Sequence, residues 1–543
     1  MAAPPPANAK RGAPSPAGPA GGGDAETAKR GLISLNNLDY QLPPDLSIVT
    51  SRTMMEHHFH TNQYTPGQRM VCLLNSGAGY IDPQNSYLTF QLRVTHPEDA
   101  RVGWGAGSAV NLFKTVQIVS RSGDEIERFE DVYRVARDMD YMQRSPAWFR
   151  TVGAMIGYND RVSPDNYIHG GRTIVIHEAT PTPTPGTTDS WVTDLNAPKG
   201  TVYNWVTYAN NDNLNGQIGN RVGAGAPVNH RLTTREVLVP LSCISNFFRT
   251  TDKLIPAALA SGLRIEIELN EALRPFVAQT VTTNAIRGTE GNGAALTTVT
   301  YEILNPRVVC DTYMLTDAIQ RAMNETIAST GLEMPFVAVH HSEYGAPANA
   351  TELHVEVRKA VSRALCVISK TQPTDLLNTL VDPTICGGTS SVFTGDLGVR
   401  ATTNNNFDGS GVRRYQARVG SLYFPHQPIN SRFQGSVAGD YATNVILEMY
   451  HHTVRGGMSA FKRPNTVGNL TPFDFMNGAF AIWTDLERSS SQNLTGIPIN
   501  NSRVVELSYR FDNAANLTGN TLHVFLKYVR LVRVFLNNVE VEE

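Results

Sequence analysis

The sequence predicts an all-β protein built from two β-sandwiches in tandem. Segments of alternating apolar and polar residues recur in both halves, helical periodicity is rare, and 543 residues exceed what one hydrophobic core usually serves. Each half also ends in two strand-like segments, residues 263–269 followed by 301–315 in the first half and residues 504–511 followed by 522–536 in the second. Sandwiches of about 270 and 225 residues, loops included, would account for the length.

The strands are predicted from a period of two, which is typical of antiparallel sheets with one buried face. In the first half the inward side chains of two such strands are Leu88, Phe90, Leu92, Val94, Leu263, Ile265, Ile267 and Leu269. Between the last four lie Arg264, Glu266 and Glu268, which we expect to point outward. In the second half the inward residues of 352–358 are Leu353, Val355 and Val357, and the outward residues of 505–511 are Glu506, Ser508 and Arg510.

Two segments have the spacing of helices. Residues 123–143 place Ile126, Phe129 and Tyr133 at three- and four-residue intervals after Ser122, a possible N-cap. A second helix is expected over residues 316–325, with Thr316 as its cap. We therefore expect a first domain at residues 45–316 and a second at 317–543.

The first 44 residues are expected to form a flexible arm. Of residues 1–31, 21 are Ala, Pro or Gly, so the segment has little apolar surface to offset the entropy cost of ordering. Its net charge of +2 is a weak indication of contact with an anionic partner. No secretory signal or membrane span is visible, so we expect a soluble protein made and kept inside a cell.

Composition excludes several classes of protein. Charged residues make up 17% and the net charge is −3, which gives no global field to attract nucleic acid and argues against a histone-like condenser. The cysteines are odd in number and form no CxxC pair, so we expect buried free thiols instead of a disulfide scaffold or a zinc site: Cys72, Cys243, Cys310, Cys366 and Cys386.

Motifs of common enzymes are absent. There is no GxxxxGK[ST], HExxH or GxSxG, and the glycines at 103, 105 and 107 lack the spacing and the βαβ context of a dinucleotide site. We therefore expect no catalytic residue, no cofactor and no small-molecule substrate.

A histidine-rich segment, residues 56–60 (EHHFH), offers an alternative. In a strand, Glu56, His58 and His60 would share one face and could bind a metal. A cupin motif would need a glycine six residues before His58, where Arg52 stands. We therefore expect an exposed or interface strand and no metal, and we take the pairs His340-His341 and His451-His452 as structural.

Several short phrases, in order along the chain from about residue 45 to the C-terminus, resemble those of a known family. They are residues 79–90 (GYIDPQNSYLTF), 111–116 (NLFKTV), 121–128 (RSGDEIER), 239–245 (VPLSCIS), 261–267 (SGLRIEI), 494–503 (LTGIPINNSR) and 525–535 (FLKYVRLVRVF). The chain resembles the double jelly-roll major capsid proteins of polinton-like viruses, adintoviruses and virophages.

The resemblance implies two eight-stranded jelly rolls and a structural role in an icosahedral virion of a double-stranded DNA virus. The expected partners are two further copies in a pseudo-hexameric homotrimer, neighbouring capsomers, penton and minor capsid proteins, and, through the arm, a weak genome contact. The long turn-rich stretches are then expected to form outward towers and contacts between capsomers: residues 180–186, 210–227, 288–293 and 402–411. The runner-up is a β-sandwich carbohydrate-binding or carbohydrate-active protein, in which Trp191 and Trp205 would serve a loop-borne site.

Overall fold

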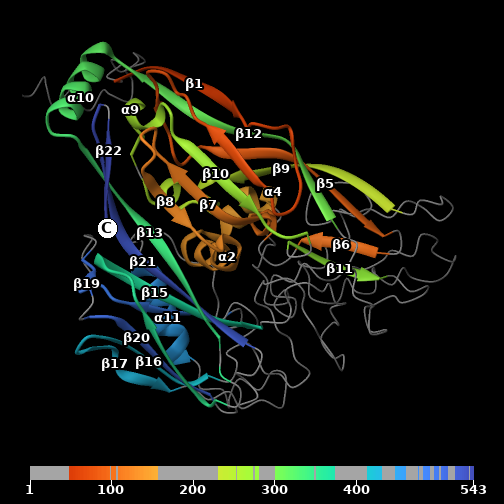
Figure 1. Cartoon of the computed structure of the whole chain (residues 1–543), viewed down its shortest axis with the longest axis vertical. Helices are drawn as coiled ribbons and strands as arrows, with labels where there is room; N and C mark the ends of the chain where they lie inside the picture. The colour runs from red at the N-terminus through yellow and green to blue at the C-terminus, as the bar shows by residue number, and fades with distance from the viewer. Residues whose placement is uncertain are drawn as a thin grey trace, which may run out of the picture. The chain divides into compact units, whose positions relative to one another are not determined.

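The computed structural model (Figure 1) is all-β with a few short helices. It describes residues 48–97, 100–104, 108–156, 230–251, 253–272, 275–280, 300–345, 347, 350–373, 412–430, 447–459, 475, 481–488, 495–500, 503–511, 520–536 and 538–543. Residues Val49–Glu543 form one compact unit, and Met1–Ile48 form another, of which only Ile48 is described. The predicted arm, the four turn-rich stretches, Cys386, Trp191 and Trp205 lie outside the described residues.

The first half forms a sandwich of two antiparallel sheets. The larger has the order β1 (Val49–His58), β12 (Thr300–Leu315), β5 (Tyr87–Pro97), β9 (His230–Pro240), and β12 also pairs with β2 (Gln63–Tyr64) and β4 (Tyr80–Ile81). The smaller has the order β3 (Arg69–Leu73), β10 (Arg264–Leu269), β7 (Phe113–Val119), β8 (Glu125–Phe129). A separate two-stranded antiparallel sheet pairs β6 (Ala100–Trp104) with β11 (Phe276–Thr280).

The second half repeats this plan. Its larger sheet has the order β13 (Leu332–Gly345), β21 (Asn520–Val534), β15 (Val361–Pro373), β18 (Ile482–Asp485), with β19 (Ile497–Ile499) on β15 and β22 (Val539–Glu542) on β21. Its smaller sheet has the order β14 (Glu352–Val357), β20 (Val505–Phe511), β16 (Val412–Val419), β17 (Leu422–Asn430).

The two sandwiches share one topology. When the eight principal strands of each half are counted along the chain, each large sheet contains the first, eighth, third and sixth, in that order. Each small sheet contains the second, seventh, fourth and fifth. This order is that of an eight-stranded jelly roll, so the predicted fold class of two tandem jelly rolls is confirmed.

The period-two predictions are confirmed. Leu88, Phe90, Leu92 and Val94 of β5 are all buried, as are the inward residues predicted for β10 and β14, and the outward residues predicted for β20 are half-buried or exposed. Glu266 is an exception, because its side chain is buried although it points away from the core. Arg69 and Arg264 cover its carboxylate, the latter with Nε 2.5 Å from Oε1, and these ion pairs keep the charge partnered.

The helices are short: η2 (Ser108–Leu112), α2 (Val132–Gln143), α3 (Pro146–Trp148), η3 (Phe149–Gly153), α4 (Ala154–Ile156), α7 (Leu241–Ile244), α8 (Asn246–Thr250), α9 (Ala257–Ala260), α10 (Asp317–Ser329) and α11 (Leu447–Ser459). Among the described residues no helix is both long and apolar enough to span a membrane.

The predicted helix over residues 123–143 is wrong in its first part. Ile126 and Phe129 lie in β8, where both are buried, and Ser122 lies in the preceding turn. The strand β8 pairs with β7, with Phe129 opposite Val116. The helix α2 begins only at Val132, after Asp131, which has the left-handed φ of 49°. The predicted helix at residues 316–325 is confirmed as α10, with Thr316 at its N-cap position and its end at Ser329.

The core residues of both sandwiches belong to one continuous apolar cluster. Four of the five cysteines are described, and all four are buried free thiols as predicted. Burial raises the pKa of Cys72 and of Cys243 to about 12, so both are uncharged at neutral pH.

Candidate functional site: the junction between the sandwiches

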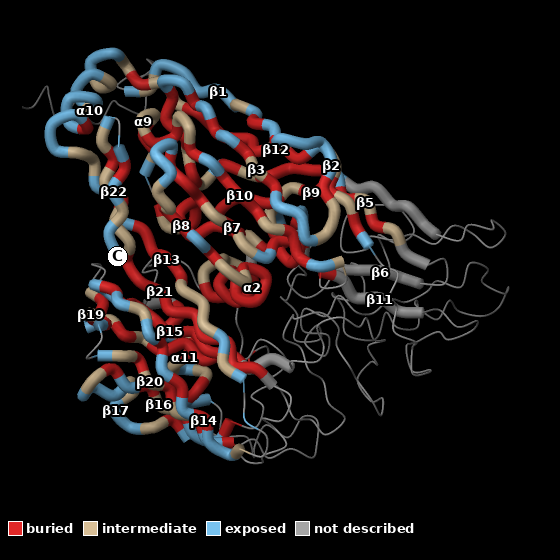
Figure 2. The backbone as a smooth tube through the Cα atoms, in the orientation of Figure 1, coloured by how far each residue is buried: buried red, intermediate tan, exposed pale blue. Residues whose placement is uncertain are grey.

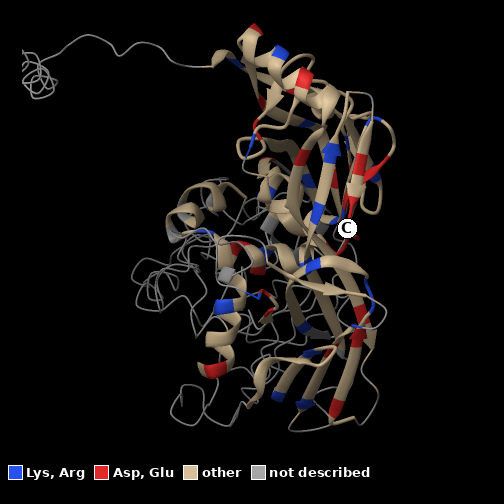
Figure 3. Cartoon of the chain, turned by 90° about the vertical axis from the view of Figure 1, so that its left-hand side faces the viewer, with Lys and Arg blue, Asp and Glu red and all other residues tan. Residues whose placement is uncertain are grey.

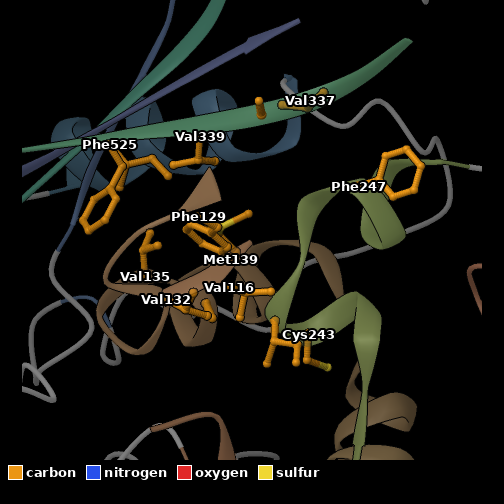
Figure 4. Close-up of a cluster of buried hydrophobic side chains, with 14 of the residues drawn as sticks. Val116, Phe129, Val132, Val135, Met139, Cys243, Phe247, Val337, Val339 and Phe525 are labelled. Atoms are coloured by element: carbon orange, nitrogen blue, oxygen red, sulfur yellow. The ribbon is translucent and has the colours of Figure 1, made fainter. Parts of the chain in front are cut away.

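The candidate site is the junction, where β13, β15 and β21 of the second sandwich meet β8, α2 and α8 of the first. Phe247 of α8 packs edge-on against Phe336 of β13, with ring centroids 5.3 Å apart. Figure 4 shows Val339 and Phe525 beside Val135 and Phe129, and all four belong to the common apolar cluster. The two jelly rolls therefore pack against each other through buried apolar surface and are not connected by a linker alone.

Hydrogen bonds between side chains and the backbone cross the junction as well. Arg530 of β21 donates from Nη1 to the carbonyl of Ile126 in β8, at 2.8 Å. The N–H of Val337 donates to Oγ1 of Thr250 at 3.0 Å. Directional bonds of this kind fix the register between the two sandwiches, which apolar packing alone does less strictly.

A buried ion pair also joins the halves. Nζ of Lys370, on β15, lies 2.8 Å from Oδ2 of Asp138 in α2 and donates to the carbonyl of Arg134 at 2.7 Å. Arg137 contacts the other oxygen of Asp138 at 2.9 Å. Burial acts to raise the pKa of Asp138, but the charges of Lys370 and Arg137 outweigh it and hold the pKa below its usual value.

On the first sandwich's side of the junction, two buried carboxylates bind groups of neighbouring helices. Glu127 accepts hydrogen bonds from the Ser245 hydroxyl at 2.5 Å and from the N–H groups of Asn246 and Phe247 at 2.8 and 3.0 Å. Burial nevertheless raises the pKa of Glu127 above its usual value. Asp140, which is fully buried, pairs with Arg249 at 3.1 Å.

A histidine cluster lies at the same junction. Nδ1 of His341, on β13, lies 3.2 Å from Oδ2 of Asp131. Nε2 of the same ring lies 3.1 Å from Nδ1 of His523, on β21. The His341 ring stacks on that of Phe525, with centroids 4.6 Å apart. Burial lowers the pKa of His341 to about 4, so the imidazole is neutral at neutral pH.

The predicted histidine segment lies elsewhere, with Glu56, His58 and His60 exposed and His57 and Phe59 buried. Glu56, His58 and His60 are on the solvent side of β1 or just beyond it, and Glu56 pairs with Arg307 at 3.3 Å. His340 and His341 lie on a strand, whereas His451 and His452 lie on α11 with rings 6.1 Å apart.

The second sandwich carries an open polar groove of about 670 Å³ on the outer side of β14 and β20. Glu356 and Glu506 stand directly opposite each other there. Arg358 pairs with the first at 2.8 Å and Arg418 with the second at 3.4 Å. Because each carboxylate already has a cationic partner, this groove does not present the acid and base of a glycosidase.

Charge is mixed over the strands. In Figure 3, Lys and Arg stand among Asp and Glu, and neither sign gathers on one face of this view. This distribution agrees with the small net charge, and in this view the described residues form no basic stripe of the kind that binds nucleic acid.

Comparison with known proteins supports the fold. No family model matches the chain, and no curated protein matches it. A chain in the cryo-EM structure of the Sputnik virophage is similar, with a TM-score of 0.54 and 9% identity over 93% of this chain and 90% of that one. The mavirus major capsid protein gives a TM-score of 0.47 at 9% identity, over 93% of this chain and 93% of that one. The Faustovirus major capsid protein also gives a TM-score of 0.47, at 11% identity over 94% of this chain and 96% of that one.

The strand order of both halves and the likeness to the Sputnik chain define the class of protein: a double jelly-roll protein. The fold that the sequence resemblance implied is therefore the fold of this chain.

Proposed function

We propose that the chain is a viral major capsid protein whose homotrimers form pseudo-hexameric capsomers that tile an icosahedral shell. The observation that carries this proposal is the junction, which joins two jelly rolls of identical strand order into one body through shared core, hydrogen bonds and a buried ion pair. A trimer of such bodies presents six similar sandwiches around one axis. One gene product can then fill a hexagonal lattice.

The first strand supports an assembly role. Among the described residues, β1 pairs only with β12 over its length, and most of its side chains are exposed, including Met54. Figure 2 shows this strand in the colour of exposed residues, whereas the strands at the junction are buried. A long edge strand left open in a soluble protein is a site for unwanted pairing, so a covering subunit is the natural solution.

The low content of charged residues fits the same role, because obligate interfaces are depleted in Lys, Glu and Asp at their centres. The protein is then a component of the virion that is synthesised and assembled inside the host cell, and it is not an enzyme. Its partners are further copies of itself, neighbouring capsomers, and penton and minor capsid proteins.

The proposed domains are an arm at residues 1–44 and jelly rolls at 45–316 and 317–543. Among the described strands, no pairing joins one half to the other, which supports the second boundary. We expect the arm to lie on the inner, genome-facing side or to thread between capsomers. Deleting it should leave soluble trimers that assemble poorly, and unchanged assembly would contradict this role.

Sizing of the purified chain tests the function. We expect a trimer of roughly three times 59.4 kDa. A monomer that is retained on a glycan column would instead favour the carbohydrate-binding alternative.

A further inference from the structure

Asp131, His341 and His523 form a set of metal-ligand side chains that the capsid function does not use. One ligand atom from each of the three lies within 4.8 Å of the other two. The three residues come from the start of α2, from β13 and from β21, so the set exists only because the two sandwiches meet.

We propose that this set binds a zinc ion, with Nε2 of His341 and Nδ1 of His523 as direct ligands. Imidazole nitrogens are preferred ligands of zinc, and water completes the coordination where a protein supplies fewer than four ligands. The two nitrogens face each other at 3.1 Å. Two nitrogens bound at about 2.0–2.1 Å to one tetrahedral zinc ion are roughly 3.3 Å apart, so only a small adjustment is needed.

Asp131 acts on this site through His341. Its Oδ2 lies 3.2 Å from Nδ1, the ring nitrogen that does not face His523. A carboxylate in this position fixes the orientation of a ligating imidazole and increases its basicity. Asp131 is therefore a positioning residue, and its negative charge also offsets part of the charge of the ion.

The surroundings set the strength of binding. Nε of Arg134 lies 3.5 Å from the same Asp131 oxygen, and its positive charge opposes a second cation nearby. The two imidazole nitrogens can also share a proton, which competes with the metal for the pair. We therefore expect weaker binding than at a closed four-ligand structural site, and replacing Arg134 with Gln should tighten it.

The test uses the full chain after dialysis against EDTA. Equilibrium dialysis with elemental analysis should find one more zinc ion in the parent than in His523→Ala, and zinc should raise the melting temperature of the parent but not of the variant. Magnesium, which prefers oxygen ligands, should do neither. Asp131→Asn should weaken binding about 10- to 100-fold.

The control is the double variant His58→Ala/His60→Ala, which removes two exposed histidines and should keep the zinc of the parent. Equal zinc in the parent and in His523→Ala, or loss of zinc in the control, would overturn the proposal. If His523→Ala does not fold, anomalous scattering from crystals of the zinc-loaded parent decides: a peak between His341 and His523 supports the site, and its absence there refutes it. Neither outcome alters the trimer expected of a capsid protein, so the two proposals fail separately.

Discussion

The two large sheets have the same strand order but different surroundings. In β12 of the first sandwich, buried and more exposed side chains alternate over residues 300–304, as expected for a sheet with one face toward solvent, and a run of five buried residues follows at 308–312. In β21, its counterpart, residues 521–529 are all buried, and Figure 2 shows the contrast. The difference arises because the outer face of the second large sheet packs against α2 and α8 of the first sandwich. The same topology therefore forms two different kinds of sheet. The large sheet of the first sandwich has one face toward solvent and is called the outer wall below, whereas the large sheet of the second sandwich is covered on both faces and is called the internal layer.

The charges on the two sheets differ accordingly. Arg93 and Glu302 join β5 and β12 at 3.2 Å near the surface, with side chains 38% and 28% exposed. Lys370, on the counterpart of β5, and its partner Asp138 are almost completely buried. An ion pair in the wall should contribute little to stability, whereas removal of one partner in the internal layer should be costly.

The largest loss of stability is expected on the inward face of the small sheet, a feature that the two sandwiches have in common. Ile265 is buried on β10, so Ile265→Asp would place an unpaired carboxylate in the core and cost several kcal/mol, a large part of the roughly 5–15 kcal/mol that stabilise a domain. The yields of soluble protein and of trimer show this loss of stability. The control is Glu268→Gln, whose partner Lys114 is exposed and whose cost should stay within about 1 kcal/mol. Normal trimers from Ile265→Asp would show that the strand register is wrong.

The second effect tests the internal layer. Asp138→Asn leaves Lys370 and Arg137 without their common carboxylate and should lower the free energy of unfolding by about 3–5 kcal/mol. Urea denaturation gives the value, provided that unfolding is a single transition. Adding Lys370→Met to this variant should recover part of the loss. A cost below about 1 kcal/mol would mean that the junction is open to water.

The third effect is the pH dependence of that same contribution. Because the pKa of Asp138 is lower in the folded protein than its unfolded value of about 3.9, the carboxylate stabilises the fold above that value. The contribution disappears as the pH falls through the folded pKa. The difference in unfolding free energy between the parent and Asp138→Asn should be constant from about pH 5 to 7 and shrink below about pH 4. A difference that shrinks near pH 6 would assign the titration to another group.

The smallest effect is expected in the outer wall. Arg93→Met removes the surface pair with Glu302 and should change the unfolding free energy by about 0.2–1 kcal/mol, decreasing with added salt. Urea denaturation at low and high salt checks this. A loss as large as that of Asp138→Asn would remove the distinction between the two sheets.

How far the sequence predicts the structure depends on whether the contacts are local. The inward residues of β5, β10 and β14 and the outward residues of β20 follow from a period of two, which depends only on neighbours along the strand. Residues 123–143 show the limit, because Ile126 and Phe129 fit a helical spacing but belong to β8, a strand that forms by pairing with β7. Local spacing cannot reveal that partner.

The junction was not predictable for the same reason. Asp138 and Lys370, like Asp131 and His341, are more than two hundred residues apart and meet only when the second sandwich docks. Glu266 was expected to be exposed, and its burial depends on Arg69 from a neighbouring strand. The one cue available was residues 522–529, where six of the eight side chains are apolar. Phe525 and Val529 stand on the same face as His523 and Lys527 and interrupt the period of two, as expected for a strand buried on both faces.

Negative-stain electron microscopy of the purified chain tests the central claim most directly, since that claim is that two like jelly rolls act as one rigid unit of a trimer. Class averages viewed down the threefold axis should show a pseudo-hexagonal outline with six lobes of similar size. Monomers, or trimers with three lobes whose halves take variable positions, would contradict both the rigid junction and the capsid function built on it.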